Sequence, residues 1–353
     1  MSGPRSAGPE LEERPAGAEL LPRAALTEVL LGRAPLVGAR CDPRAPRGLV
    51  SPIEARARLG LLYADPVEEE ARSLRQRGHL HDLGVVARCL ATRLLWPAGG
   101  ARAARRPFIV SARVDNVTFR EALAAILAPP PPPDRGRARM IHFVHPHALT
   151  LAARDRDHRA RLARADVLLP DGVGLRAAAS MLGIALRGNL NGTDLLPLLC
   201  HEAAACGVPL ALVGAAPGVA DSCAARLARD TPGLRIPLVS HGYLSDAEAA
   251  AVAGRVRALG RVVVLVGMGS PLQERWAWQH LSAAPQASVV TVGGLFDFFS
   301  GRIPRAPPAV RELGLEWLYR LAQEPRRLAG RYLLGNPLFL LLALRQRGFG
   351  PEP

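Results

Sequence analysis

The residues best suited to chemistry lie in the stretch DVLLPDGVGL, where one carboxylate, Asp171, follows a short apolar strand over residues 167–169. Gly172 and Gly174 come directly after it. Glycine has no Cβ, so backbone N–H groups here can approach a substrate closely. Open α/β sheets bind ligands beyond the carboxyl ends of their strands, which favours a catalytic or binding role for Asp171. The alternative is a simple strand-to-helix connection with Asp171 as a turn residue.

Further strand–turn–helix units downstream favour the catalytic or binding interpretation. GVPLALVG leads into the turn AAPG, VVVLVG into MGSPLQERW, and SVVTVGG into LFDFFSG. These turns place Gly214, Gly269 and Gly293 at strand ends, and a helix N-terminus after such a turn suits a phosphate. Because the carboxyl ends of parallel strands meet at one edge of a sheet, the turns predict one shared cleft.

The elements that must position these residues alternate between short apolar runs and helical segments. This alternation predicts an α/β fold with a doubly wound, largely parallel, Rossmann-like sheet. We expect strands near residues 108–116, 141–144, 167–169, 207–214, 234–239, 262–267 and 288–294. Helix N-termini are expected at Thr118 (with Glu121 in a capping box), Asp194, Ser245 and Ser270, the last followed by Pro271 at the first helical position.

Composition limits the classes of function. The formal net charge is +14, but all 45 basic residues are Arg, a pattern typical of GC-rich codon usage. They are spread along the chain without interleaved aromatic residues, which disfavours a nucleic-acid partner. The five cysteines form no CxxC pair, which disfavours a disulfide framework or zinc site. We find no signal peptide and no spanning segment, and therefore expect a cytoplasmic protein.

Two other polar patterns could bind a metal, but each has a simpler explanation. Asp155-Arg156-Asp157 has the DxD form of a metal-binding motif, but it falls in a polar helical stretch, and we expect a solvated helix surface. His145 and His147 flank a proline at a strand end and could both face a cleft. With no third ligand nearby, they do not predict a zinc site.

Four segments are expected along the chain. Residues 1–50 are rich in Pro, Gly, Ala and Arg and predict disorder, residues 51–98 predict helices, residues 107–303 form the α/β domain, and residues 304–346 form an Arg-rich helical appendage. The second segment weakly resembles the tail of bacterial polyprenyl-phosphate sugar transferases without their catalytic core. A helical hairpin that packs on the main domain or lies on a membrane is the favoured alternative.

The appendage combines arginines with the apolar run at residues 338–344. This run is too short to span a bilayer but suits a position at its interface, with Arg near lipid phosphates. The alternative is a hairpin that packs on the domain, with Trp317 and Tyr319 partly buried. We favour the membrane-facing interpretation because Arg320, Arg326 and neighbouring arginines cluster beside the apolar run.

Several blocks, taken in order, closely resemble the WecG/TagA/CpsF family of bacterial glycosyltransferases over about residues 108–340. They are LLPDGVGL, NGTDL, VGAAPGVA, VGMGSPLQERW, VGGLFDFFSG and RAPPAVRELGLEWLYRLAQEPRRLAGRYL. The resemblance implies transfer of a hexose or N-acetylhexosamine, typically N-acetylmannosamine, from a UDP-sugar to a polyprenyl-diphosphate-linked sugar in surface or exopolysaccharide synthesis. It further implies inversion at the sugar, no metal or other cofactor, and a peripheral place on the inner face of the cytoplasmic membrane. The resemblance is also compatible with a homo-oligomer.

Site residues follow from the matching motif positions. The resemblance makes Asp171 the general base that takes the acceptor hydroxyl's proton. It implies that Gln273 contacts the nucleotide sugar and that Asp297 is structural or faces the uridine. The tail arginines would hold a diphosphate. Catalytic residues are thus expected at Asp171, His145 and Gln273. Substrate-binding residues are expected at His147, Gly172, Gly174, Asn191, Asp194, Gly214, Gly269, Glu274, Gly293, Asp297, Arg320, Arg327 and Arg331.

Two positions depart from the family pattern. Many members have Thr-Pro-Asn or Asn-Pro-His where this chain has His145-Pro146-His147, and many have Arg where it has Asn189. Arg187 lies near enough in sequence to substitute. These departures keep a second hypothesis open, a lapsed module that binds a nucleotide sugar without catalysis. A dinucleotide oxidoreductase is excluded because no GxGxxG follows the first strand.

Overall fold

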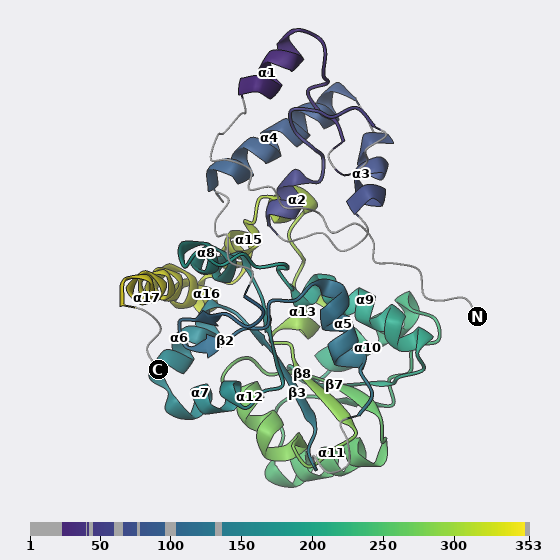
Figure 1. Ribbon diagram of the computed structural model, residues 1–353. Coiled ribbons are helices and arrows are strands. Elements are labelled where there is room, and N and C mark those ends of the chain that lie inside the picture. Colours follow the sequence, from purple (N-terminus) through teal and green to yellow (C-terminus); the bar gives the residue numbers. More distant parts are fainter. Residues whose placement is uncertain are drawn as a thin grey trace, which may run out of the picture.

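The computed structural model describes residues 23–39, 41, 45–59, 66–75, 78–95, 104–130 and 136–349. At its centre lies a six-stranded sheet in the order β4-β3-β8-β7-β5-β6, in which every neighbouring pair is parallel (Figure 1). The strands are β3 (Arg139–Val144), β4 (Val167–Pro170), β5 (Leu210–Gly214), β6 (Leu238–Ser240), β7 (Val262–Gly267) and β8 (Ala287–Thr291). The prediction of an α/β fold with a parallel, Rossmann-like sheet is confirmed.

Helices cover both faces of the sheet, because successive side chains of a strand point to opposite sides. Val263 and Leu265 of β7 face one core cluster, and Val262 and Val264 face the other. The first cluster is completed by α5 (Phe119–Leu127), α9 (Gly192–Ala205), α10 (Val219–Asp230) and α13 (Leu295–Phe299). The second is completed by α11 (Asp246–Ala258), α12 (Leu272–Trp276) and the π-helix η2 (Ala277–Leu281). Burial on both faces explains the unbroken apolar run VVVLVG.

Local signals at the helix N-termini are partly confirmed. Thr118 caps α5 and Ser245 caps α11, each in a capping box. The expected cap at Asp194 is wrong, because Asn191 caps α9 by accepting from the N–H of Thr193. The expected cap at Ser270, with Pro271 as the first helical residue, is also wrong: α12 begins at Leu272 with Pro271 at the N-cap position, and the Ser270 hydroxyl donates to Glu274 Oε1 at 2.7 Å.

Two expected strands are shorter than predicted. Residues 108–116 form only the small antiparallel pair β1 (Phe108–Ile109) and β2 (Ala112–Arg113), which lies outside the main sheet. The chain reverses between them at Val110, whose φ is 60°. Within residues 234–239, regular pairing begins only at Leu238.

The N-terminal module consists of the described residues between 23 and 95. Its helices are α1 (Arg23–Leu30), α2 (Glu54–Arg58), α3 (Pro66–Arg75) and α4 (His79–Leu95). Val37 and Val50 are buried with Val85 of α4 in a separate small core. Residues 23–39 and 45–50, for which we expected disorder, are therefore folded. The rest of residues 1–50 lies outside the described residues, except Cys41.

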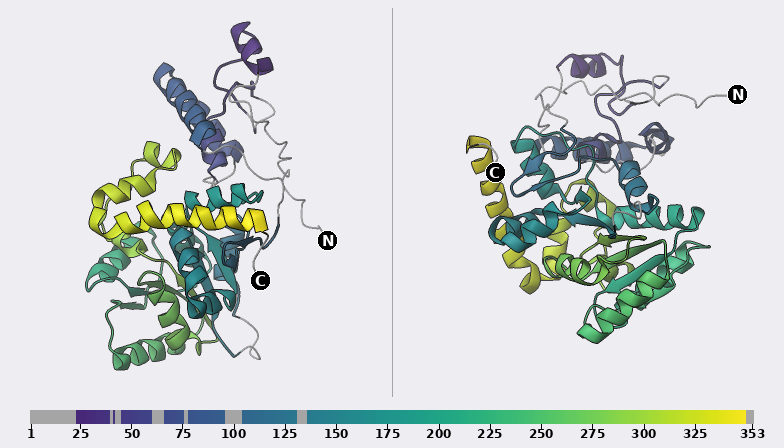
Figure 2. Two further views of the ribbon diagram at one scale, coloured as in Figure 1. Left: turned by 90° about the vertical axis from the view of Figure 1, so that its left-hand side faces the viewer. Right: turned by 60° about the horizontal axis from the view of Figure 1, so that its bottom comes forward.

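The C-terminal appendage is a series of short helices that ends in one longer one. Its elements are α14 (Pro308–Glu312), α15 (Glu316–Gln323), α16 (Pro325–Ala329), the π-helix η3 (Gly330–Gly335) and α17 (Asn336–Phe349). Figure 2 shows α17 crossing the α/β domain over α6 (Pro146–Arg154) and α8 (Val173–Met181). Phe339 and Ala343 are buried in that contact, whereas Leu341 and Leu344 are exposed. No helix in the described ranges is long and apolar enough to cross a membrane.

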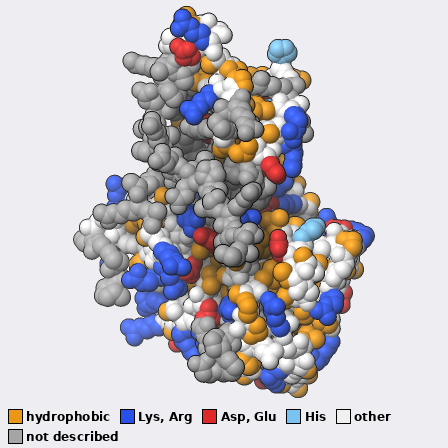
Figure 3. Space-filling view, turned by 45° about the vertical axis from the view of Figure 1, so that its right-hand side comes forward, with side chains coloured by type: hydrophobic (Ala, Val, Ile, Leu, Met, Phe, Trp, Pro, Cys, Tyr) orange, Lys and Arg blue, Asp and Glu red, His pale blue; other side chains and the backbone are white. Residues whose placement is uncertain are grey.

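The arginines do not form one stripe on the face shown in Figure 3. Basic side chains there run from the N-terminal module at the top to the base of the α/β domain, with apolar and uncharged side chains between them. Several arginines of the chain are bound in ion pairs, such as Arg88 of α4 with Glu312 of α14 at 3.0 Å. That pair joins the N-terminal module to the appendage.

Candidate active site

A cavity of about 830 Å³ lies at the carboxyl ends of the parallel strands, with the appendage as its opposite wall. Each strand contributes the residues that follow it: His145 after β3, Asp171 after β4, Ala215 after β5, Gly242 after β6, Met268 after β7 and Gly293 after β8. From the appendage come Glu316, Trp317, Arg320, Arg327 and Arg331. The predicted cleft is therefore present, and residues more than a hundred positions apart line it.

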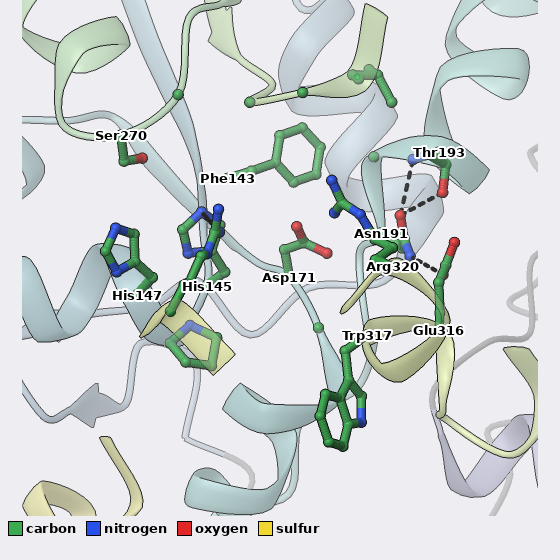
Figure 4. A pocket seen from close by; sticks show the side chains of 18 of the residues that line it. Phe143, His145, His147, Asp171, Asn191, Thr193, Ser270, Glu316, Trp317 and Arg320 are labelled. Atoms are coloured by element: carbon green, nitrogen blue, oxygen red, sulfur yellow. Dashed lines mark hydrogen bonds between the residues drawn. The ribbon is translucent and has the colours of Figure 1, made fainter. Parts of the chain in front are cut away.

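Asp171 lies at the centre of this cavity, with the two histidines on one side and Arg320 on the other (Figure 4). Its own N–H donates to the carbonyl of Val144 at 2.8 Å, which joins the turn to β3. The next N–H, of Gly172, donates to Asn189 Oδ1 at 2.7 Å. Gly172 has φ +91°, a conformation that favours glycine. These bonds fix the backbone of the turn that carries the Asp171 side chain.

The pKa of Asp171 is raised to about 7, chiefly because burial penalises the charged carboxylate. Arg320 and Arg331 pull the pKa down, while Glu316 and Asp194 push it up. A carboxylate with a pKa near 7 is a much stronger base than an ordinary aspartate, yet is still ionised in a substantial fraction at neutral pH.

His145 and His147 stack beside Asp171, with ring centroids 6.1 Å apart and an interplanar angle of 19° (Figure 4). His145 caps α6: its Nδ1 accepts from the N–H of Ala148 at 3.1 Å. Its Nε2 lies 2.7 Å from Nη2 of Arg331. Burial and the nearby Arg331 lower the pKa of both rings, to about 4 for His147 and well below the usual value for His145. Both imidazoles are therefore neutral at pH 7.

The side chain of Gln273 joins two glycine turns by hydrogen bonds. Its Oε1 accepts from the N–H of Gly293 at 2.9 Å and of Gly269 at 3.2 Å, and its Nε2 donates to Glu274 Oε1 at 2.9 Å. The side chain is only 2% exposed. Gln273 thus fixes the ends of β7 and β8, and its amide is already occupied by protein partners. Glu274 is fully buried behind it and does not line the cavity.

The predicted glycines differ in position. Gly172, Gly174, Gly269 and Gly293 line the cavity, but Gly214 does not. A Cβ on Gly214 would lie 2.3 Å from the carbonyl oxygen of Gly267. Gly214 therefore allows β5 and β7 to close together at their carboxyl ends, where the connections after the two strands run in opposite directions along the sheet.

The NGTD turn connects the α/β domain to the appendage. Asn191, having capped α9, donates from Nδ2 to Glu316 Oε2 at 3.1 Å (Figure 4). Asp194 pairs with Arg305 at 2.5 Å and with Arg311 at 3.4 Å. Both residues line the cavity as expected, but their polar atoms hold the appendage against it.

The remaining predicted residues lie on the appendage side. Arg320 lies over the ring of Phe298 at 4.8 Å from its centroid. Arg327 is half exposed and pairs with Glu324, and Asp297 accepts from Arg302 at 3.4 Å. All line the cavity. Arg187, the possible substitute, instead pairs with Glu121 on the exposed side of α5 and does not line it.

Sequence reasoning missed several residues of the wall. Glu316 and Trp317 lie inside the GLEWLYRL block and Phe298 inside the VGGLFDFFSG block, so the motifs contained the signal, whereas Asn189 was noted only as a departure from the family pattern. Asp155 and Asp157 are exposed at the start of α7 (Arg156–Ala163), where Asp155 is the N-cap, so the expected solvated surface is confirmed. Within the described ranges, no three His, Cys, Asp or Glu residues are grouped as metal ligands would be.

Residues 108–352 match the glycosyl transferase WecG/TagA/CpsF family. A Bacillus spizizenii protein named N-acetylglucosaminyldiphosphoundecaprenol N-acetyl-beta-D-mannosaminyltransferase is 32% identical over 220 residues, which are 62% of this chain and 84% of that protein. A Bacillus subtilis protein of the same name is 29% identical over 224 residues, 62% of this chain and 86% of its own length. The family match begins after the N-terminal module.

Proposed function

The chain belongs to the WecG/TagA/CpsF family of glycosyltransferases, and from this membership we propose that it moves a hexose or N-acetylhexosamine, of the N-acetylmannosamine type, from a UDP-sugar to a polyprenyl-diphosphate-linked sugar. The names of both relatives describe an N-acetylmannosamine transfer to N-acetylglucosaminyl-diphosphoundecaprenol. The product would enter bacterial surface or exopolysaccharide synthesis.

The observation that carries this proposal is the Asp171 carboxylate, which lies at the centre of the cavity with a pKa of about 7. In an inverting displacement, the acceptor hydroxyl oxygen forms a bond to the anomeric carbon while the bond to the donor's phosphate oxygen breaks. The hydroxyl proton passes to Asp171 as the new bond forms. A partly buried carboxylate with a raised pKa suits this step, because it takes up a proton more readily than an exposed one with an ordinary pKa.

The departing diphosphate must be stabilised by positive charge, and the appendage carries arginines that would supply it. Arg320, Arg327 and Arg331 line the cavity on the side opposite the strand ends. Charge-assisted hydrogen bonds from guanidinium groups would stabilise the negative charge that develops on the leaving oxygen. We therefore propose a reaction that requires no metal, with arginines in the role that a divalent cation plays elsewhere.

Because the proposed acceptor carries a lipid, the transfer would take place at the inner face of the cytoplasmic membrane. Leu333, Leu334, Leu341 and Leu344 are exposed on η3 and α17, beside Arg345 and Arg347. Such a surface suits insertion among lipid headgroups. Because the same appendage supplies the cavity's arginines, contact with the membrane would place the lipid diphosphate near Asp171.

The alternative, a module that binds a nucleotide sugar without catalysis, rests on the departures at His145 and Asn189. Asn189 has a clear role here, since it holds the N–H of Gly172 beside Asp171. A turn kept in place this way supports an intact base and favours the enzyme.

A donor panel tests the proposal. The purified protein in detergent would receive a short-chain polyprenyl-diphosphate-GlcNAc acceptor and individual UDP-sugars, with UDP release followed in the presence and absence of acceptor. We expect acceptor-dependent release with one donor, unaffected by EDTA, and a loss of about 10²- to 10⁴-fold in Asp171→Asn. UDP-sugar binding without release for any donor would favour the lapsed module.

A further inference from the structure

The N-cap contact of His145 indicates which of its ring nitrogens carries the proton. A neutral imidazole has one N–H and one lone pair. The Nδ1 lone pair accepts from the backbone N–H of Ala148 at 3.1 Å, which satisfies one of the free N–H groups in the first turn of α6. With this cap kept, the proton of the neutral ring lies on Nε2, the atom that points away from the helix and toward Arg331.

This assignment creates a conflict at Arg331. Its Nη2 lies 2.7 Å from His145 Nε2, and a guanidinium nitrogen can only donate. Two donors thus face each other. Moving the ring proton to Nδ1 would relieve this contact but would set Nδ1–H against the N–H of Ala148. Protonating both nitrogens would place an imidazolium among Arg331, Arg320 and His147, whose electrostatic effects all disfavour it.

An acceptor atom that lies to one side of the two nitrogens, within hydrogen-bond distance of both, removes the conflict. Of the charged cavity residues near His145, Arg320 and Arg331 are cationic, and Asp171 is the carboxylate beside them in the wall. A diphosphate oxygen carries the negative charge that an Arg and a neutral N–H donor both favour. We propose that His145 Nε2–H and Arg331 together bind one oxygen of a substrate diphosphate, with His145 acting as a neutral hydrogen-bond donor.

This assignment gives His145 a part in the displacement. When the bond from the anomeric carbon to the phosphate oxygen breaks, its electron pair stays on the diphosphate, and the two donors stabilise that charge. The acceptor's proton goes to Asp171, so His145 neither gains nor loses one. That the bound anion is a diphosphate rests on the proposed function. That the N–H groups of His145 and Arg331 face each other does not depend on it.

The sharpest variant is His145→Asn. Asparagine is a good N-cap, so its Oδ1 can still accept from the N–H of Ala148, while its shorter side chain leaves no donor at the position of Nε2. His201→Asn is the matched control, because His201 is an exposed helix residue outside the cavity. Calorimetry would measure the Kd of UDP, UMP and a short-chain polyprenyl diphosphate for the three proteins.

We expect His145→Asn to weaken binding of a diphosphate ligand about tenfold or more, with His201→Asn unchanged. A loss for UDP but not UMP identifies the nucleotide diphosphate, and a loss for the polyprenyl diphosphate alone identifies the lipid. Unchanged affinity for both diphosphates overturns the inference. Transfer activity separates the two proposals. If diphosphate binding depends on His145 but no donor supports transfer, only the proposed function is contradicted. If transfer occurs but diphosphate binding does not depend on His145, only this inference is contradicted.

Two further measurements test the neutral donor directly. Long-range ¹H–¹⁵N spectra of histidine-labelled protein, with His145 assigned by its absence in His145→Asn, are expected to find the proton on Nε2. A proton on Nδ1 overturns the assignment. The ratio of UDP affinities between wild type and His145→Asn should stay constant from about pH 6 to 8. A ratio that falls as the pH rises would mean that an imidazolium binds the anion.

Discussion

Asp194 of α9 and Arg305, which precedes the appendage helices, form an ion pair with 2.5 Å between Oδ1 and Nη2. The carboxylate also receives Arg311 at 3.4 Å, and its side chain is only 8% exposed. Through this carboxylate, the α/β domain holds the segment that brings Arg320 and Arg331 to the cavity. Asp194 was expected to bind substrate; its observed contacts are with the protein's own arginines.

Asp194→Asn should loosen the appendage. Removing the charge leaves Arg305 and Arg311 close together without this carboxylate, at a cost of about 2–3 kcal/mol after allowance for partial exposure. We expect a Tm lower by several degrees, faster proteolysis of the appendage and lower kcat/KM. Asp230→Asn is the control, since Asp230 pairs with arginines on the exposed surface of α10. Equal proteolysis of the two variants would contradict a tethering role.

The raised pKa of Asp171 predicts how activity depends on pH. A general base must be ionised, and Asp171 loses its proton at about pH 7. We expect kcat/KM to rise about tenfold per pH unit below this value and to level off above it. Initial rates from pH 5 to 9 check the midpoint, and Asp171→Asn should lose this limb. A wild-type profile that is already flat at pH 5 would mean that Asp171 has an ordinary pKa.

The same pKa predicts that Asp171 destabilises the fold. The unfolded chain has the ordinary value of 3.8 and the folded chain about 7, so the folded state binds more protons between these limits. Stability contributed by the protonated form is present below pH 4 and is lost as the pH rises through 7. Asp171→Asn should therefore be more stable than wild type at pH 8 by about 2–4 kcal/mol, and equal to it near pH 4. Denaturant titrations at both pH values would measure this, and a less stable variant at pH 8 would contradict it.

Gly214→Ala should be severely destabilising. The new Cβ would lie 2.3 Å from the carbonyl oxygen of Gly267, and φ at Gly214 is +149°. Moving β5 from β7 would cost about 3 kcal/mol or more. Gly254→Ala in α11 is the control, with its nearest contact at 3.9 Å, and should be neutral or stabilising by up to about 1 kcal/mol. Chemical unfolding of both variants tests this, and similar stabilities would contradict the close approach of the strands.

The exposed leucines of the appendage predict membrane binding. Leu334→Ser with Leu341→Ser should weaken sedimentation with anionic phospholipid vesicles about tenfold or more, because two exposed apolar side chains are lost from the surface. A second pair, Leu80→Ser with Leu83→Ser, removes exposed leucines from α4 of the N-terminal module. If only the second pair weakens binding, the membrane contact belongs to the N-terminal module and the appendage proposal fails.

The sequence alone determined the features that depend on neighbouring residues. The capping boxes at Thr118 and Ser245 each involve a side chain three positions away, so residue types were enough to find them. The apolar run of β7 and the glycine turn after Asp171 likewise identified strands and the edge where a ligand binds. The motif blocks, which match the family over residues 108–352, identified the glycosyltransferase.

Only the tertiary structure decided what each polar atom contacts. Arg331 meets His145 across 186 positions, and Asn191 meets Glu316 across 125. No local pattern contains such a pairing, because it depends on how the appendage packs on the sheet. The pKa of Asp171 likewise depends on burial, which comes from the whole fold. The residue type showed that Asp171 could take up a proton, and the packing around it set its pKa.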